Sequence, residues 1–144
     1  MNKSRTIIVS VAVFLVCGGL IIGWSVYQRG GIGDANAAVR VFTDENFEKE
    51  VVEASTRHPI LVDFYAPWCF PCRMLEPIIE EVARELKGQA VIGKLDTERN
   101  LLPRRLGVTQ IPSVWIVKDG EIRESFLGVV SKEKIIQALK KSGS

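Results

Sequence analysis

The chain has 144 residues, which is enough for one domain with a hydrophobic core and too short for two ordinary domains. Its formal net charge at pH 7 is +2, and residues 39–144 are formally neutral, because the whole surplus lies in the first 38 residues. Without a basic surplus or a basic cluster, the sequence predicts neither nucleic-acid binding nor a polybasic membrane-binding patch.

An uncharged, apolar stretch runs from residue 7 to residue 27 and contributes to the positive mean hydropathy of +0.13. As a helix, about 21 residues would be roughly 31 Å long, which matches a hydrocarbon core of about 30 Å. Lys3 and Arg5 precede the stretch, so the positive-inside rule places the N-terminus in the cytoplasm and the remainder outside. We therefore expect residues 1–28 to form a single-pass anchor of the cytoplasmic (inner) membrane that contacts the lipid bilayer through residues 7–27.

A cleaved secretory signal peptide is the alternative, because residues 35–37 have the A-x-A form of a cleavage site. The apolar stretch exceeds the about 7–15 residues of a typical signal and ends well before this site, which favours an uncleaved anchor. A lipoprotein signal at Cys17 is disfavoured by the bulky residue before it. Residues 29–38 are rich in glycine and small residues and predict a flexible linker. Cleavage near Ala37 would leave the following domain soluble in the periplasm.

Residues 39–144 are predicted to form the globular domain, in which strands and helices alternate. The expected elements in chain order are a strand at 39–42, a helix capped by Thr43 or Asp44 that ends before Pro59, a strand at 60–66, a helix that follows the CFPC segment, contains Pro77 and reaches Lys87, a strand at 91–95, a short helix at 99–106, two strands at 114–117 and 121–127, and a final helix capped by Ser131. Asp119-Gly120 is typical of a type I′ turn, so the last two strands should pair antiparallel. This order predicts an α/β fold with a central mixed β-sheet flanked by crossover helices.

Cys69 and Cys72 are the cysteines of this domain, and they lie where a predicted strand gives way to a helix. Free backbone N–H groups and the helix dipole stabilise a thiolate at such a position, so Cys69 is expected to have a lowered pKa and to act as the nucleophile. Cys72 follows one turn later on the same helix face, where it can attack a mixed disulfide; we expect it to be the more buried of the two. The spacing thus favours a redox-active dithiol.

Three other uses of the pair are less favoured. A purely structural disulfide would close a very short loop, and the stabilisation from loop closure shrinks with loop length. A zinc site needs more ligands than two cysteines and His58. Arg73 stands where the c-type haem motif requires histidine. We therefore expect no metal and no cofactor other than the redox disulfide.

Asp63 interrupts an otherwise apolar strand. A buried carboxylate is costly, so such a group either has a raised pKa or is paired, and a raised pKa suits acid–base chemistry near neutral pH. The alternative is a structural ion pair with Lys94.

These features together resemble the thioredoxin family from residue 39 to residue 141. The resemblance is carried by the run from Val62 to Cys72, followed by Pro77, Lys94, Ile111-Pro112 and Gly128. It implies a thioredoxin fold in which Pro112 is a cis-proline facing the dithiol. The Ile111 backbone would pair with an extended substrate segment, and Gly128 would line the same groove.

The resemblance also implies roles for residues around the dithiol. Trp68 would belong to the docking surface, and Asp63 and Lys94 would form a buried pair beneath Cys72 that is associated with proton transfer. Pro71 suits the first helical turn, where its missing N–H removes little hydrogen bonding. Phe70 departs from the family, which usually has glycine there, and it enlarges the apolar rim beside the dithiol. We include Trp68, Phe70 and Pro71 among the expected substrate-binding residues.

The sequence therefore predicts a protein-disulfide reductase that exchanges thiols and disulfides with extracytoplasmic proteins and is recharged by a membrane thiol-electron transporter. Two alternatives remain open. One is a periplasmic disulfide oxidase or isomerase, because potentials in this family range from about −270 to about −120 mV. The other is a binding or chaperone module with incidental redox activity.

Overall fold

A computed structural model describes residues 39–144 of the chain. The predicted anchor (1–28), the predicted linker (29–38) and the candidate cleavage site (35–37) lie outside the described residues. Within residues 39–144, no helix combines the length and the apolar character that crossing a membrane requires.

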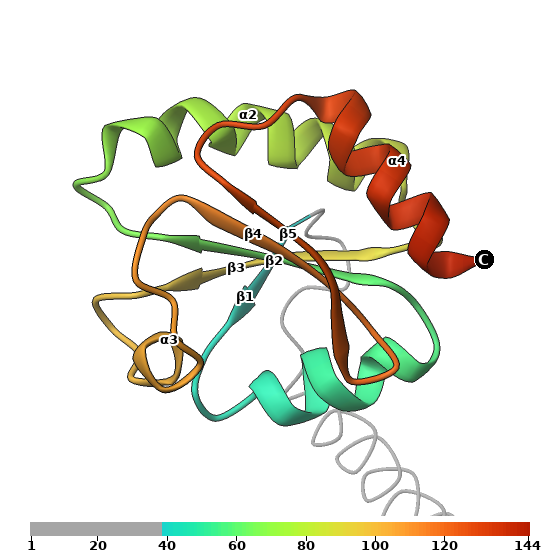
Figure 1. Cartoon of the computed structure of the whole chain (residues 1–144), viewed down its shortest axis with the longest axis horizontal. Coiled ribbons are helices and arrows are strands. Elements are labelled where there is room, and N and C mark those ends of the chain that lie inside the picture. Colours follow the sequence, from blue (N-terminus) through green and yellow to red (C-terminus); the bar gives the residue numbers. More distant parts are fainter. Residues whose placement is uncertain (1–38) are drawn as a thin grey trace, which may run out of the picture. The chain divides into compact units, whose positions relative to one another are not determined.

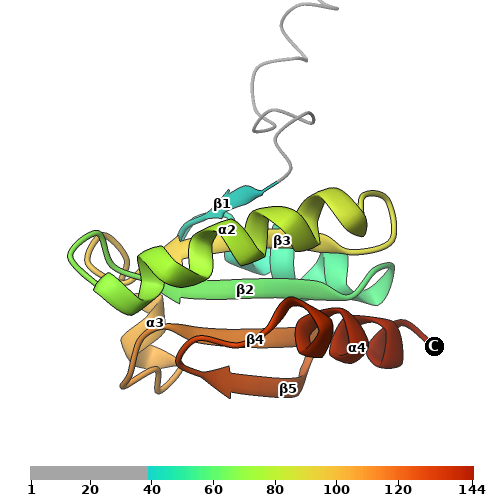
Figure 2. The same ribbon diagram turned by 90° about the horizontal axis from the view of Figure 1, so that it is seen from above.

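A five-stranded mixed sheet forms the centre of the domain (Figures 1 and 2). Its spatial order is β1-β3-β2-β4-β5. The strands are β1 (Arg40–Phe42), β2 (Ile60–Tyr65), β3 (Val91–Asp96), β4 (Ser113–Lys118) and β5 (Glu121–Leu127). The pairs β1/β3 and β2/β3 are parallel, whereas β2/β4 and β4/β5 are antiparallel. The predicted mixed sheet with an antiparallel hairpin at one edge is confirmed.

Helices cover both faces of the sheet, as Figure 1 shows. One face carries α2 (Phe70–Glu85) and α4 (Lys132–Gly143), and the opposite face carries η1 (Glu48–Glu53), η2 (Ala54–Thr56) and α3 (Leu102–Arg105). Two separate clusters of buried apolar side chains fill the two interfaces between helices and sheet. The domain therefore has three layers with the sheet in the middle.

Strand β2 lies at the centre of the sheet and is buried on both faces. Val62 and Phe64 belong to the cluster under η1, whereas Leu61 belongs to the cluster under α2 and α4. Because side chains alternate along a strand, Asp63 lies on the same face as Leu61, beneath α2. The alternation thus directs the single carboxylate of this strand toward the helix that begins at the dithiol.

The first helical segment differs from the prediction. It is a π-helical turn followed by a 3₁₀ turn, and no side chain caps it. The carboxylate of Asp44 instead accepts hydrogen bonds from the backbone N–H groups of Leu101 (2.8 Å) and Leu102 (2.9 Å). Asp44 therefore caps α3, a helix more than fifty residues later in the chain, because the fold brings that unpaired helix end within reach.

Most of the remaining local predictions are confirmed, although the helix expected at 99–106 is limited to α3 (Leu102–Arg105). Asp119 and Gly120 both have positive φ (56° and 75°), as a type I′ turn requires, and they join β4 to β5. Ser131 accepts a hydrogen bond from the backbone N–H of Lys134 at 3.4 Å and caps α4. Pro77 lies inside α2, which ends two residues before the predicted Lys87.

Candidate active site

The cysteine pair lies at the N-terminus of α2, where the structure joins Cys69 and Cys72 in a disulfide. Cys69 is the N-cap residue, and its Sγ accepts a hydrogen bond of 3.2 Å from the backbone N–H of Cys72. This N–H is one of the groups that a helix leaves unpaired in its first turn. In the reduced protein the same donor and the helix dipole would stabilise a thiolate on Cys69. The predicted position of the pair is confirmed.

The two cysteines are equally buried, contrary to the expectation that Cys72 would be more buried. Cys69 is 3% exposed and Cys72 is 4% exposed. Both pack in a small cluster with Ala66, Tyr65 and Ile111. The expectation considered only the helix face, whereas both cysteines belong to a cluster against which Ile111, from a distant part of the chain, also packs.

Large apolar side chains surround this buried pair and are open to solvent. Trp68 is 68% exposed, Phe70 63% and Met74 53%. The guanidinium of Arg73 lies 5.6 Å from the centre of the Phe70 ring, which is within the range of a cation–π contact. Pro71 is also exposed, in the first turn of α2. These residues form an apolar surface at the rim of the dithiol.

The loop before β4 packs against the cysteine pair. The Ile111–Pro112 peptide bond is cis, as the resemblance implied, and Ile111 packs against the cysteine cluster. The backbone N–H of Gly128 donates a 2.9 Å hydrogen bond to the carbonyl oxygen of Pro112. Ile111, Pro112 and Gly128 are therefore brought together, and Ile111 connects them to the dithiol.

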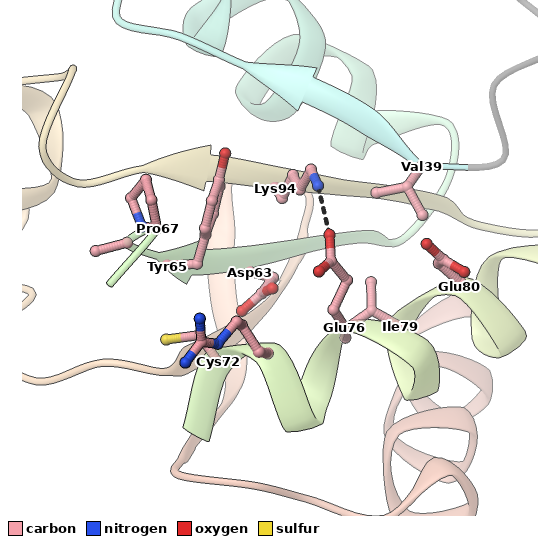
Figure 3. A pocket seen from close by; sticks show the side chains of 11 residues that line it. Val39, Asp63, Tyr65, Pro67, Cys72, Glu76, Ile79, Glu80 and Lys94 are labelled. Carbon is pink, nitrogen blue, oxygen red and sulfur yellow. Dashed lines mark hydrogen bonds and ion pairs between the residues drawn. The ribbon is translucent and has the colours of Figure 1, made fainter. Parts of the chain in front are cut away.

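A pocket of about 180 Å³ lies behind the dithiol, beneath the first turns of α2 (Figure 3). Cys72 contributes to its wall, together with side chains from β2, β3 and α2. The polar side chains that line it are those of Asp63, Tyr65, Arg73, Glu76, Glu80 and Lys94. The second cysteine thus shares a cavity with a buried carboxyl group.

Asp63 is buried in this pocket, with only 4% of the residue exposed. Its Oδ1 atom has no hydrogen-bond partner. Burial raises the pKa of Asp63 to about 7, the Lys94 ammonium opposes the rise, and the charge of Glu76 adds to it. The sequence left a raised pKa and a paired carboxylate open, and the raised pKa is the one found. Such a carboxyl group can exchange protons near neutral pH.

Lys94 does not form the expected buried ion pair with Asp63. The two residues are opposite each other in the register of β2 and β3, but Lys94 Nζ lies 2.8 Å from Oε1 of Glu76. The Lys94 side chain is 30% exposed, and the hydrogen bond to Glu76 is the main cause that raises its pKa. A long lysine stem lets the ammonium reach the solvated mouth of the pocket, where a partly hydrated carboxylate is a less costly partner than a buried one.

Glu76 was missed at the sequence level. It follows Cys72 by four residues, so both side chains lie on the same face of α2, and this spacing was the available signal. Nothing in the local sequence shows that β3 places a lysine opposite that face. Within residues 39–144, no cluster of three or more His, Cys, Asp or Glu side chains is arranged to hold a metal ion.

Comparison with known proteins relates this arrangement to a family. The family model described as Thioredoxin matches residues 38–141. A thioredoxin of Rickettsia felis is 40% identical over 101 residues, which are 69% of this chain and 94% of that protein. Thioredoxin 1 of Synechococcus elongatus is 39% identical over 100 residues, or 69% of this chain and 92% of that protein. A chloroplastic M-type thioredoxin of Pisum sativum is 38% identical over 104 residues, or 72% of this chain and 59% of that protein.

The matched region contains the whole sheet, α2 with its disulfide, and the cis-proline loop. The fold is accordingly the thioredoxin fold. In this family the redox-active disulfide does the chemistry on disulfide-containing proteins without another cofactor. The chain belongs to the thioredoxin family of disulfide oxidoreductases.

Proposed function

We propose that the protein is a protein-disulfide reductase that acts on extracytoplasmic proteins. The observation that supports it most is the buried carboxyl group of Asp63, which has a pKa of about 7. It lies behind a dithiol at a helix N-terminus. A group that titrates near the working pH can both accept and return the proton of the second cysteine.

The proposed reaction has two exchange steps. The Cys69 thiolate attacks one sulfur of the substrate disulfide, which forms a mixed disulfide and releases the other substrate sulfur as a thiolate. Cys72 then gives its thiol proton to Asp63, and its sulfur attacks the Cys69 sulfur. The Cys69–Cys72 bond forms, the bond to the substrate breaks, and the substrate leaves with both of its sulfurs reduced. Two electrons have passed from the dithiol to the substrate.

The substrate would bind on the apolar surface beside the dithiol. Trp68, Phe70 and Pro71 provide one side of this surface, and Ile111, Pro112 and Gly128 provide the other. The backbone of Ile111 would pair with an extended segment of the substrate, which fits a partner that is at least locally unfolded around its disulfide. Lys94 would influence the proton transfer to Asp63 electrostatically, because its positive charge opposes the rise in the Asp63 pKa.

The reductive direction is supported by the relatives named thioredoxin and by the combination of Asp63, Lys94 and Trp68 in this chain. Reduction of insulin with dithiothreitol as the electron source, together with equilibration in glutathione buffers, tests the direction. We expect catalysed insulin reduction and a potential below roughly −180 mV. A higher potential would favour a disulfide oxidase or isomerase instead.

The extracytoplasmic site of action is supported by the uncharged stretch at residues 7–27 and by Lys3 and Arg5 before it. In this proposal the chain is a single-pass protein of the inner membrane, recharged by a membrane thiol-electron transporter. Cleavage near Ala37 would leave a soluble domain in the same compartment. Labelling of the dithiol of a Cys17→Ser variant, reduced beforehand with dithiothreitol, in intact spheroplasts with a membrane-impermeant maleimide tests the location. A chain that is labelled only after lysis would contradict it.

The Cys72→Ser variant identifies the substrates. Without the second sulfur the mixed disulfide on Cys69 cannot be resolved, so bound partners remain covalently attached. We expect exported proteins among the trapped partners. A Cys69→Ser, Cys72→Ser double variant that supports cell growth as well as the unchanged protein would instead show that binding, and not redox exchange, is the function.

A further inference from the structure

An ion pair forms part of the wall of the pocket behind the dithiol. Lys94 Nζ on β3 and Glu76 Oε1 on α2 are 2.8 Å apart, with side chains that are 30% and 50% exposed, respectively. Figure 3 shows the two side chains meeting from the two elements, with Asp63 beside them. Both side chains of the pair are thus more exposed to solvent than Asp63, of which 4% is exposed.

The location of this pair matters because Lys94 shares the pocket with three carboxyl groups, those of Asp63, Glu76 and Glu80. It is the register partner of Asp63 on the neighbouring strand, and both line the same pocket. Its ammonium nevertheless bonds to Glu76, and Oδ1 of Asp63 is left without a hydrogen-bond partner. Glu76 thus competes with Asp63 for the one lysine in the pocket wall.

We propose that Glu76 is a positioning residue that holds the Lys94 ammonium at the mouth of the pocket and prevents a direct ion pair with Asp63, which keeps Asp63 able to take up and release a proton. The relevance of this to disulfide exchange rests on the proposed function above. Glu76 is one turn beyond Cys72 on the same helix. The residue that positions Lys94 is therefore held at a fixed distance from the cysteine that exchanges its proton with Asp63.

The charges around Asp63 are consistent with this role. Asp63 shares the pocket with Arg73, Glu76, Glu80 and Cys72 of α2, with Tyr65 of β2 and with Lys94 of β3. Burial is the main cause that raises the pKa of Asp63, while Lys94 lowers it and Glu76 raises it. Removal of the Glu76 charge would take away one raising influence and release the ammonium, which could then approach the buried carboxylate and favour its charged form.

The test follows the carboxyl group itself and requires no substrate. Asp63 in the full-length oxidised protein, in detergent micelles, is titrated by the chemical shift of its ¹³C-labelled carboxyl carbon, because the disulfide-bonded cysteines do not titrate. In Glu76→Gln we expect the midpoint to fall by about one pH unit. Glu80→Gln is the matched control: it removes the same charge from the same pocket wall, but Glu80 pairs with Arg84 rather than Lys94. Its midpoint should stay within about 0.3 unit.

A double-mutant cycle then asks whether Glu76 acts through Lys94. In a Lys94→Gln background, Glu76→Gln should shift the Asp63 midpoint by less than half of its effect in the unchanged protein. A shift of undiminished size would overturn the proposal, and so would equal shifts in Glu76→Gln and Glu80→Gln. Insulin reduction is measured separately. A protein that fails to reduce insulin refutes the proposed function, while the carboxyl titration still decides the role of Glu76.

Discussion

The two halves of α2 perform different tasks, although they belong to one continuous helix. Its C-terminal half buries Ile79, Val82 and Ala83 in the apolar cluster that α4 and the sheet share. Its N-terminal half begins with the dithiol, exposes Phe70 and Met74, and covers a pocket that contains ionisable side chains.

The difference between the halves is that the C-terminal half stabilises the domain, whereas the N-terminal half contains reactive groups whose burial destabilises it. Buried apolar side chains stabilise the C-terminal half, since each one contributes about 1.5–3 kcal/mol on full burial. The N-terminal half covers the carboxyl group of Asp63, whose Oδ1 atom is buried without a hydrogen-bond partner. Such burial costs free energy of folding. Changes in the two halves should therefore separate activity from stability.

The largest expected effect is loss of activity at the N-terminal end. Cys69→Ser should lower the rate of insulin reduction by on the order of 10³-fold or more, because no mixed disulfide can form without this sulfur. Its stability should equal that of the reduced unchanged protein within about 1 kcal/mol. Cys17→Ser, which removes the cysteine outside the globular domain, is the control and should retain full activity. Substantial turnover by Cys69→Ser would break the assignment of the chemistry to this end of α2.

Asp63→Asn should change activity and stability in opposite directions. Since burial raises the Asp63 pKa from 3.8 to about 7, the folded protein keeps a proton that the unfolded chain loses between these two values. The free energy of unfolding of the unchanged protein therefore falls as pH rises from about 4 to about 7, and it recovers nothing from this group above that range.

The neutral amide removes that penalty, so Asp63→Asn should be more stable by on the order of 2–4 kcal/mol at pH 8, with little gain at pH 4. Its reductase rate near pH 7 should be several-fold lower. Urea unfolding at both pH values measures the first effect and an insulin assay the second. A stability gain that is the same at pH 4 and pH 8 would contradict the buried, protonatable carboxyl group.

At the C-terminal half, Val82→Ala should cost stability and leave the chemistry unchanged. Val82 is fully buried, so the loss of two methyl groups and the resulting cavity should lower the free energy of unfolding by about 2 kcal/mol. The insulin reduction rate at 25 °C should stay within about two-fold, because the packing defect is remote from the dithiol. A large loss of activity in a folded variant would show that the two halves are coupled.

The smallest effect is expected on the exposed face of the same half. Arg84 lies 3.8 Å from Glu80 at the i, i+4 spacing, and both side chains are more than half exposed. Such pairs contribute about 0.3–0.5 kcal/mol, so Arg84→Ala should shift the urea midpoint only slightly and leave insulin reduction unchanged. An effect as large as that of Val82→Ala would mean that surface charge, and not apolar burial, stabilises this half.

Local sequence signals were enough for much of the fold and the site. Helical spacing of apolar residues, the short buried strand, the Asp119-Gly120 turn and the Ser131 cap each depend on neighbours within a few residues. The same is true of the cysteine pair, because two residues three apart at a helix start are adjacent in any helix. The raised pKa of Asp63 was one of two outcomes expected from the sequence, because a carboxyl group buried in an apolar strand is either protonated more easily or paired with a cation.

Contacts between distant segments were decided only by the tertiary structure. Asp44 caps α3 instead of its own helix, and Ile111 packs against the cluster in which Cys69 is as buried as Cys72. Lys94 bonds to Glu76 and leaves Asp63 without that partner. In each case a polar or apolar group had several chemically acceptable partners, and only the packing of α2 and the loops on the sheet determined which partner came within a few ångströms. The sequence by itself determined that the dithiol begins a helix, and the tertiary structure decided which charges surround the proton that the dithiol exchanges.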